Sequence, residues 1–287
     1  MAKEENRYRL KRHTVPEGIL VAIGGNEDKV YDLDILSEIA SLSGAEVPRI
    51  EVITTATAEP EEMGETYYKA FKKVAKTSVG IMHILSRHQA NDSKLMHRVR
   101  RANIVFFCGG DQLRITSILG GSRVLREIHR RYFEEYCVIA GTSAGASAMS
   151  EAMIFGGESS EALLKGTVNI TGGIGLICEV IIDTHFIRRG RISRLMQAVC
   201  MNPGFVGIGL GEDAGVVISR GHTLRVIGSG LTIVLDGQHI RYSNVADIQN
   251  GEAIAIDNLV IHALIKGYGY DLWDKKYLMP DNVALSP

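Results

Sequence analysis

Cysteine is scarce in this sequence. The 287 residues include only four, Cys108, Cys137, Cys178 and Cys200, and their spacing excludes the C-x-x-C patterns of zinc sites and redox motifs. Most of them lie in apolar runs. We therefore expect buried free thiols in a reducing compartment.

An excess of charge of either sign is also absent. The sequence has 32 Lys and Arg against 33 Asp and Glu, which gives a formal net charge of -1. No overall field therefore draws the protein to nucleic acid or to a membrane surface. A charged partner has to be recognised locally.

Long apolar runs and linkers are missing as well. No apolar run approaches the ~18 residues of a membrane-spanning helix, and residues 1–12 are too polar for a signal peptide. We therefore expect a cytoplasmic protein with no membrane partner. Because the chain shows no linker, repeat or low-complexity segment, we predict a single domain over residues 1–287.

What the chain does contain is an alternation of apolar runs, predicted as strands, and amphipathic stretches, predicted as helices. The strands are 18–24, 50–55, 79–85, 103–108 and 137–140, and the helices are 35–42, 60–76, 93–101 and 122–135. This alternation predicts an α/β fold, with a mostly parallel sheet sandwiched by helices. After residue 204, short β-branched runs at 206–210, 215–219, 223–227 and 232–235 predict antiparallel strands that extend one edge of the sheet. We expect little regular structure after Trp273.

The predicted strand 137–140 runs into Gly141-Thr142-Ser143-Ala144-Gly145 and then into Ala-rich sequence suited to a helix. This is the G-x-S-x-G pattern in a strand-turn-helix setting, where a sharp turn exposes the serine and leaves room only for small neighbours. Ser143 is therefore the candidate nucleophile, and the Ala144 N–H at the helix start can stabilise an oxyanion. The alternative is a glycine-rich turn with an incidental serine.

His185 is the candidate base among nine histidines. It follows the apolar run 180–182 and precedes an arginine-rich segment, and catalytic groups gather where parallel strands end. The alternative is a structural histidine held by Asp183. The orienting acid has two candidate sites, Asp183 and the Glu212-Asp213 pair. With Glu212 the chain order is Ser, His, Glu, which differs from the Ser, Asp/Glu, His order of α/β-hydrolases.

Taken together, the motifs resemble the cyanophycinase family. They are Gly109-Gly110-Asp111-Gln112, residues 141–146, Asp183-x-His185-Phe186 followed by Arg189-Gly190-Arg191, and Gly209-x-Gly211-Glu212-Asp213. The similarity spans roughly residues 18–219. The family belongs with the aspartyl dipeptidases in a serine peptidase group whose fold is similar to that of class I glutamine amidotransferases.

The resemblance implies an intracellular exopeptidase, working as a homodimer, that degrades cyanophycin to β-Asp-Arg dipeptides. Cyanophycin has a poly-aspartate backbone with arginine on each β-carboxyl group. By position, Ser143 matches the nucleophile, His185 the base and Glu212 the acid. An amide of Gly110 or Asp111 would complete the oxyanion site beside that of Ala144. The chemistry calls for no metal and no organic cofactor.

The resemblance also implies a substrate pocket. Gln112, Asp183, Arg189, Arg191 and Arg194 match its lining, where a carboxylate would bind the guanidinium of the substrate and arginines its carboxylates. Glu158 or Glu161 could add a further carboxylate. Thr184 departs from the family, in which a Gln before the histidine is expected; its shorter side chain would relax recognition of the dipeptide unit.

Two other functions stay open at this point. The same three catalytic groups would serve a dipeptidase for α-aspartyl or isoaspartyl dipeptides, because only the pocket loops differ. The other is a non-catalytic sensor of arginine or aspartate peptides that has kept the serine turn. The sequence leaves open whether the loop 24–29 contacts substrate.

Overall fold

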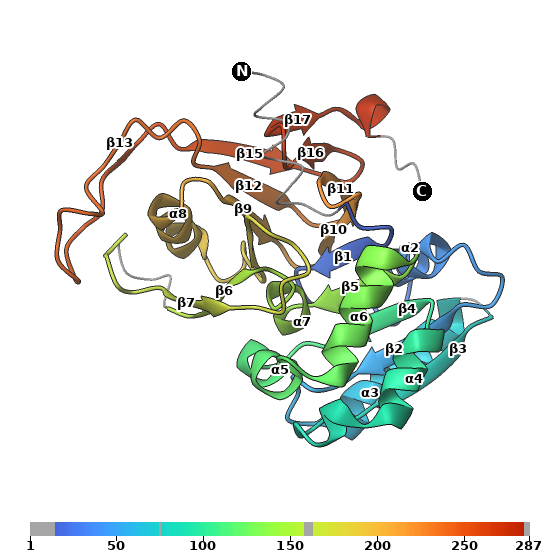
Figure 1. The fold of residues 1–287 in the computed structure, drawn as a ribbon. Coiled ribbons are helices and arrows are strands. Elements are labelled where there is room, and N and C mark those ends of the chain that lie inside the picture. The colour runs from blue at the N-terminus through green and yellow to red at the C-terminus, as the bar shows by residue number, and fades with distance from the viewer. Residues whose placement is uncertain (1–14, 75, 158–162, 284–287) are drawn as a thin grey trace.

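The computed structural model describes residues 15–74, 76–157 and 163–283 (Figure 1). Its largest element is a nine-stranded sheet. The strands of its parallel half, in spatial order, are β1 (Ile19–Ile23), β5 (Val138–Thr142), β4 (Ile104–Phe107), β2 (Arg49–Ile53) and β3 (Ser78–Met82). Beyond β1 the sheet continues with antiparallel strands, β10 (Ala214–Ser219), β11 (Thr223–Gly228), β16 (Gly269–Asp271) and β17 (Lys276–Leu278).

Helices cover both faces of the parallel half. The helices α2 (Asp34–Leu42) and α3 (Pro60–Val74) pack on one face, and α4 (Ser93–Arg101) and α6 (Arg123–Glu134) pack on the other. Alternate residues of a strand point to opposite faces of the sheet. Val21 therefore packs in the core under α2 and α3, whereas its neighbours Leu20 and Ala22 pack in the core under α4 and α6. The predicted α/β sandwich with a parallel sheet and antiparallel C-terminal strands is confirmed.

A second sheet has four strands, in the order β15 (Val260–Leu264), β12 (Thr232–Asp236), β9 (Val206–Leu210) and β8 (Val180–Asp183). The helix α8 (Ile192–Met201) packs on this sheet through Leu195 and Val199. The prediction that all four late runs extend the first sheet was therefore wrong for 206–210 and 232–235. Those two runs pair with each other, and their outer neighbours are β8 for 206–210 and β15 for 232–235. An apolar run does not specify its partner strand.

The remaining elements are short. They are α5 (Gln112–Leu119), α7 (Ala144–Ser147), β6 (Ala152–Gly156), β7 (Asn169–Gly172), β13 (Tyr242–Ser243), β14 (Ile256–Asp257) and the 3₁₀ turns Gln89–Asn91 and Pro280–Asn282. The expectation of little regular structure after Trp273 was wrong, because β17 lies there and pairs with β16. All four cysteines are free thiols, but Cys178 is exposed rather than buried.

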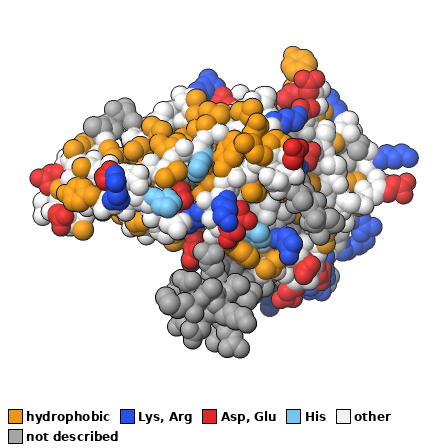
Figure 2. All heavy atoms as spheres, turned by 90° about the horizontal axis from the view of Figure 1, so that it is seen from above, with side chains coloured by type: hydrophobic (Ala, Val, Ile, Leu, Met, Phe, Trp, Pro, Cys, Tyr) orange, Lys and Arg blue, Asp and Glu red, His pale blue; other side chains and the backbone are white. Residues whose placement is uncertain are grey.

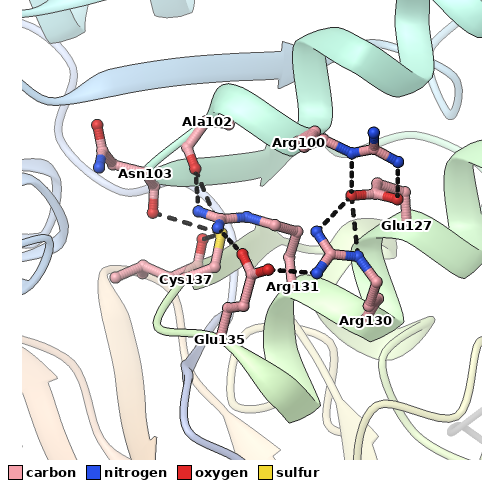
Figure 3. Close-up of polar contacts among 9 residues, drawn as sticks. Arg100, Ala102, Asn103, Glu127, Arg130, Arg131, Glu135 and Cys137 are labelled. Atoms are coloured by element: carbon pink, nitrogen blue, oxygen red, sulfur yellow. Dashed lines mark hydrogen bonds and ion pairs between the residues drawn. The ribbon is translucent and has the colours of Figure 1, made fainter.

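An ion pair joins α4 to α6, and further ion pairs lie along α6 beside it (Figure 3). Arg100 of α4 donates to both oxygens of Glu127, and Arg130 donates to the Oε1 atom of the same carboxylate. Arg130 and Arg131 also pair with Glu135. The side chain of Glu127 is only 6% exposed, so the contact between the two helices is made by a nearly buried carboxylate.

Apolar side chains are exposed on one face of the molecule. Seen from above, hydrophobic side chains gather along the middle of the surface near the C-terminal strands (Figure 2). Exposed apolar residues from this part of the chain include Ile261, Ile265, Tyr277 and Met279. None of the helices in the part of the chain that the structure describes combines the length and the apolar composition of a membrane span.

Candidate active site

A cavity of about 700 Å³ lies where β1, β5 and β4 end. Loops that follow these strands and β8 and β9 line it together with α3. The lining residues are Gly25, Asn26, Glu27, Lys29, Met63, Tyr67, Gly109, Gly110, Thr142, Ser143, His185, Arg188, Arg189 and Glu212. This is the end of a parallel sheet where ligands bind in α/β folds.

Ser143 occupies the sharp turn after β5. Its backbone has φ 52° and ψ -115°, a strained conformation for a residue with a side chain, and such strain gathers at functional sites. The turn is close-packed, since a Cβ atom on Gly145 would lie 2.5 Å from the carbonyl oxygen of Phe107. The predicted requirement for a small residue two positions after the serine thus has a direct steric cause.

His185 and Glu212 continue a hydrogen-bonded line from Ser143. The Oγ atom of Ser143 lies 3.1 Å from Nε2 of His185, and Nδ1 of His185 lies 2.9 Å from Oε1 of Glu212. When Nδ1 carries the proton it donates to Glu212, and Nε2 is free to accept the serine proton. This arrangement has the geometry of a nucleophile, a general base and an orienting acid.

The carboxylate of Glu212 is held in its ionised form. Hydrogen bonds from His185 and from Arg188 lower the pKa of Glu212 below its ordinary value. The Nη1 atom of Arg188 lies 3.0 Å from Oε2, and Nδ2 of Asn26 lies 3.3 Å from the same oxygen. The ionised Glu212 supports His185 as a general base, because it stabilises the imidazolium that forms when His185 takes a proton.

The end of β1 anchors all three segments. The carbonyl of Ile23 accepts from the N–H of Ser143 at 2.9 Å, and that of Gly24 accepts from the N–H of His185 at 2.8 Å. The next carbonyl, of Gly25, accepts from Asp213, the neighbour of Glu212, at 3.0 Å. Three segments that are distant in sequence are therefore set against one another by successive carbonyl groups of one strand end.

Of the predicted oxyanion donors, Ala144 opens α7 directly after Ser143, and Gly110 lines the cavity. The N–H of Asp111 instead donates to the carbonyl of Ala56 at 2.9 Å, so it is already in use. The helix α7 is only a single turn of residues 144–147. Its dipole is therefore small, and any oxyanion stabilisation at Ala144 rests on the local N–H group.

The structure separates the predicted substrate residues into two groups. Arg189 lines the cavity beside His185. In contrast, the carboxylate of Asp183 is buried, with 1% of its side chain exposed, and both of its oxygens accept from Arg194, with Nε of Arg194 2.6 Å from Oδ2. Arg191 donates to Asp183 at 3.3 Å and to the carbonyl of Thr184 at 2.6 Å. Asp183, Arg191 and Arg194 are therefore engaged with one another, close to His185 in the chain.

The remaining predicted residues also lie away from the cavity lining. The amide nitrogen of Gln112 donates to the carbonyl of Ile154 at 3.0 Å, and Thr184 is buried. Glu158 and Glu161 lie outside the described residues. Among the residues that the structure describes, no three His, Cys, Asp or Glu side chains are grouped as metal ligands.

Sequence reasoning missed a buried acidic group at this site. Glu27 is a buried residue of the cavity lining that contacts Thr142 and Tyr67, and Lys29 lies beside it. The available signal was weak: a glutamate and a lysine follow the two glycines at the end of an apolar strand, a position where ligands gather.

Comparisons with known proteins identify the family. The profile described as peptidase family S51 matches residues 19–227. The chain belongs to peptidase family S51. A protein named cyanophycinase from Synechococcus elongatus is 34% identical over 261 residues, which are 91% of this chain and 81% of that protein. A cyanophycinase from Trichormus variabilis is 35% identical over 259 residues, which are 90% of this chain and 87% of that protein.

Among solved structures, a peptidase from an acI-B1 actinobacterium superposes with a TM-score of 0.66. The match covers 90% of this chain and 98% of that chain at 18% sequence identity, which shows a shared fold and no more. Family S51 membership confirms the prediction of a serine peptidase related to the cyanophycinases.

Proposed function

We propose that this S51 peptidase hydrolyses cyanophycin to β-Asp-Arg dipeptides through an acyl-enzyme on Ser143. The observation that carries the proposal is the hydrogen-bonded line from Ser143 through His185 to Glu212, which opens into the cavity. The similarity to cyanophycinases along nine-tenths of the chain supports the choice of substrate.

The reaction is an acyl transfer. His185 removes the hydroxyl proton as the Oγ atom of Ser143 attacks the scissile carbonyl carbon, and Glu212 stabilises the imidazolium. The N–H groups of Ala144 and Gly110 stabilise the oxyanion of the tetrahedral intermediate. His185 then protonates the leaving amine, and the acyl-enzyme forms. Water attacks the ester with His185 again acting as the base, and this step releases the carboxylate product.

The two alternative functions receive less support. A dipeptidase would share the catalytic groups, but the relatives aligned over most of the chain are cyanophycinases. A sensor needs no base, yet His185 and Glu212 are aligned with Ser143 by hydrogen bonds. Binding alone gives no reason for that alignment.

The proposal includes a homodimer and a cytoplasmic location, both drawn from the family resemblance. Light scattering during size-exclusion chromatography measures the mass of the assembly, which should be twice that of the 31.4 kDa chain. Fractionation of cells that express the protein tests the location.

Incubation with purified cyanophycin followed by mass spectrometry tests the substrate. We expect β-Asp-Arg as the accumulating product from the earliest time points, as an exopeptidase releases it. The Ser143→Ala protein serves as the control for contaminating activity. Cleavage of aspartyl dipeptides with an intact polymer would favour the dipeptidase, and tight binding of the polymer without cleavage would favour the sensor.

A further inference from the structure

A buried carboxylate next to the nucleophile takes no part in the mechanism above. The side chain of Glu27 has 0% of its surface exposed. Its Oε2 atom accepts from Oγ1 of Thr142 at 2.8 Å, and the hydroxyl of Tyr67 donates to its Oε1 atom. Burial and Glu27 together raise the pKa of Tyr67 well above its ordinary value, so Tyr67 stays a donor. An ionised Glu27 in this position needs a cation nearby.

Lys29 supplies that cation. Its Nζ atom lies 3.4 Å from Oε1 of Glu27 and donates to the backbone carbonyl of Glu27 at 2.9 Å. The same atom lies 5.4 Å from the centre of the Tyr67 ring, within the range of a cation–π contact. These contacts hold the end of a side chain that is flexible in most surroundings.

The loop that carries Lys29 is itself fixed. The carboxylate of Asp28 accepts from the N–H groups of Val30 at 2.8 Å and Asp32 at 2.6 Å. Backbone hydrogen bonds, those from Val30 and Tyr31 foremost, hold the pKa of Asp28 well below its usual range. The N–H of Asp28 also lies 3.3 Å from Oδ1 of Asp213, so the loop is tied to the segment of the catalytic acid.

The side chain of Lys29 nevertheless remains partly open to the cavity. Lys29 lines the same cavity as Ser143, and 22% of its side chain is exposed. An ammonium group has three N–H donors. One points to the Glu27 carbonyl and another lies near its carboxylate, which leaves capacity for a ligand that enters the cavity.

We propose that Lys29 is a specificity-determining residue that binds a carboxylate of the substrate beside Ser143. This inference rests on the proposed function and assigns one of its contacts. Each unit of cyanophycin carries an arginine with a free α-carboxylate, a matching anion for an oriented ammonium. Glu27 and Tyr67 keep Lys29 in place before substrate arrives, and this preorganisation reduces the entropy lost on binding.

Two substrates and a set of variants test the proposal. The substrates are short oligomers of β-Asp-Arg units, one with free arginine carboxylates and one with these groups as primary amides. We expect the wild type to prefer the carboxylate form roughly 10- to 100-fold in kcat/KM. Lys29→Met should lose that preference because its kcat/KM falls on the carboxylate substrate alone. Lys29→Arg should keep part of the preference. Lys69→Met, which removes an exposed ammonium of α3, is the matched control and should behave as wild type.

Loss of Lys29 alone leaves the buried Glu27 without its cation, and that variant could unfold for this reason. The double variant Glu27→Gln with Lys29→Met removes both charges and should show the same loss of preference. Equal losses on both substrates would overturn the proposal and leave Lys29 as a counter-ion of Glu27. A wild type that cleaves neither oligomer nor the polymer would overturn the proposed function and this inference together.

Discussion

Gly25 lies directly against the imidazole of His185, at the edge that faces Ser143. A Cβ atom built on Gly25 would lie 2.4 Å from Nε2 and 2.5 Å from Cε1 of His185. The backbone of Gly25 has φ +100°, which residues with side chains rarely adopt. This position therefore sets how closely the base can approach the end of β1.

The Gly25 contact gives the first prediction. Gly25→Ala should displace His185 and lower kcat by roughly 100-fold or more, since small misplacements of a catalytic group have effects of that size. Gly267→Ala is the matched control: its φ is +90°, and a Cβ atom there would have nothing within 4 Å. The control should lose stability through backbone strain but keep kcat. Similar kcat values for the two variants would contradict the contact.

The second prediction concerns the nucleophile. Ser143→Ala should lower kcat by roughly 10⁴- to 10⁶-fold, because the catalytic groups act as a unit. Its melting temperature should stay near that of the wild type. Ser147→Ala, which removes a buried hydroxyl from the helix α7 next to Ser143, should retain activity. Activity in Ser143→Ala would eliminate the acyl-enzyme mechanism.

Glu212 is the subject of the third prediction. Glu212→Gln keeps the shape of the side chain but removes the charge that stabilises the imidazolium, so kcat should fall roughly 10³- to 10⁴-fold with little change in KM. Steady-state kinetics on the polymer measures both constants. Because the pKa of Glu212 is lowered, its ionised form should persist as the pH falls below the ordinary range of a glutamate. A near-normal kcat in this variant would remove Glu212 from the catalytic group.

The fourth prediction distinguishes a structural role of Arg194 from a substrate-binding role of Arg189. Arg194→Met would leave the buried Asp183 short of its main partner, and such changes cost about 3–5 kcal/mol. We expect lower stability in denaturant and, because Asp183 lies two residues from His185, a lower kcat. Arg189→Met should instead raise KM at nearly unchanged stability, since Arg189 lines the cavity. The opposite pattern would return Arg194 to the substrate pocket.

The fifth prediction is a pH dependence of stability. Burial raises the pKa of Glu127, but hydrogen bonds from Arg100 and Arg130 outweigh burial and lower it to about 2. A lowered folded-state pKa means stability that is complete above the unfolded-state pKa of about 4.3 and is lost as the pH falls toward the folded-state value. Glu127→Gln should remove about 1–3 kcal/mol at pH 7 and flatten this acid dependence. Glu65→Gln, from an exposed pair with Lys69, should change stability by less than about 0.5 kcal/mol.

Much of the fold could be predicted because apolar runs and helix periods are local properties. The turn at Ser143 was also predictable, because its glycines are a local sequence pattern. The structure gives the physical reason for them: a Cβ atom on Gly145 would clash with Phe107. The sheet to which a strand belongs was not predictable. The runs 206–210 and 215–219 are both short and apolar, yet the first pairs with β8 and β12 and the second pairs with β1.

Side-chain partners marked the limit of prediction at the site. The sequence placed Asp183 and Arg194 near the site but could not reveal that they bind each other, since either could equally have faced a charged substrate. The helix α5 was missed although Asp111 caps it through the N–H of Leu113 at 2.8 Å. Glu27 was missed because its partners, Tyr67 and Thr142, come from elements distant in sequence.

Labelling by a serine-directed fluorophosphonate, followed by peptide mapping, tests whether Ser143 is a nucleophile activated by His185. The experiment measures the rate and the position of labelling. We predict one adduct, on Ser143, which forms more slowly when cyanophycin is present and far more slowly in His185→Ala. An adduct on another residue would contradict the account, as would a labelling rate at Ser143 that neither the polymer nor the loss of His185 changes.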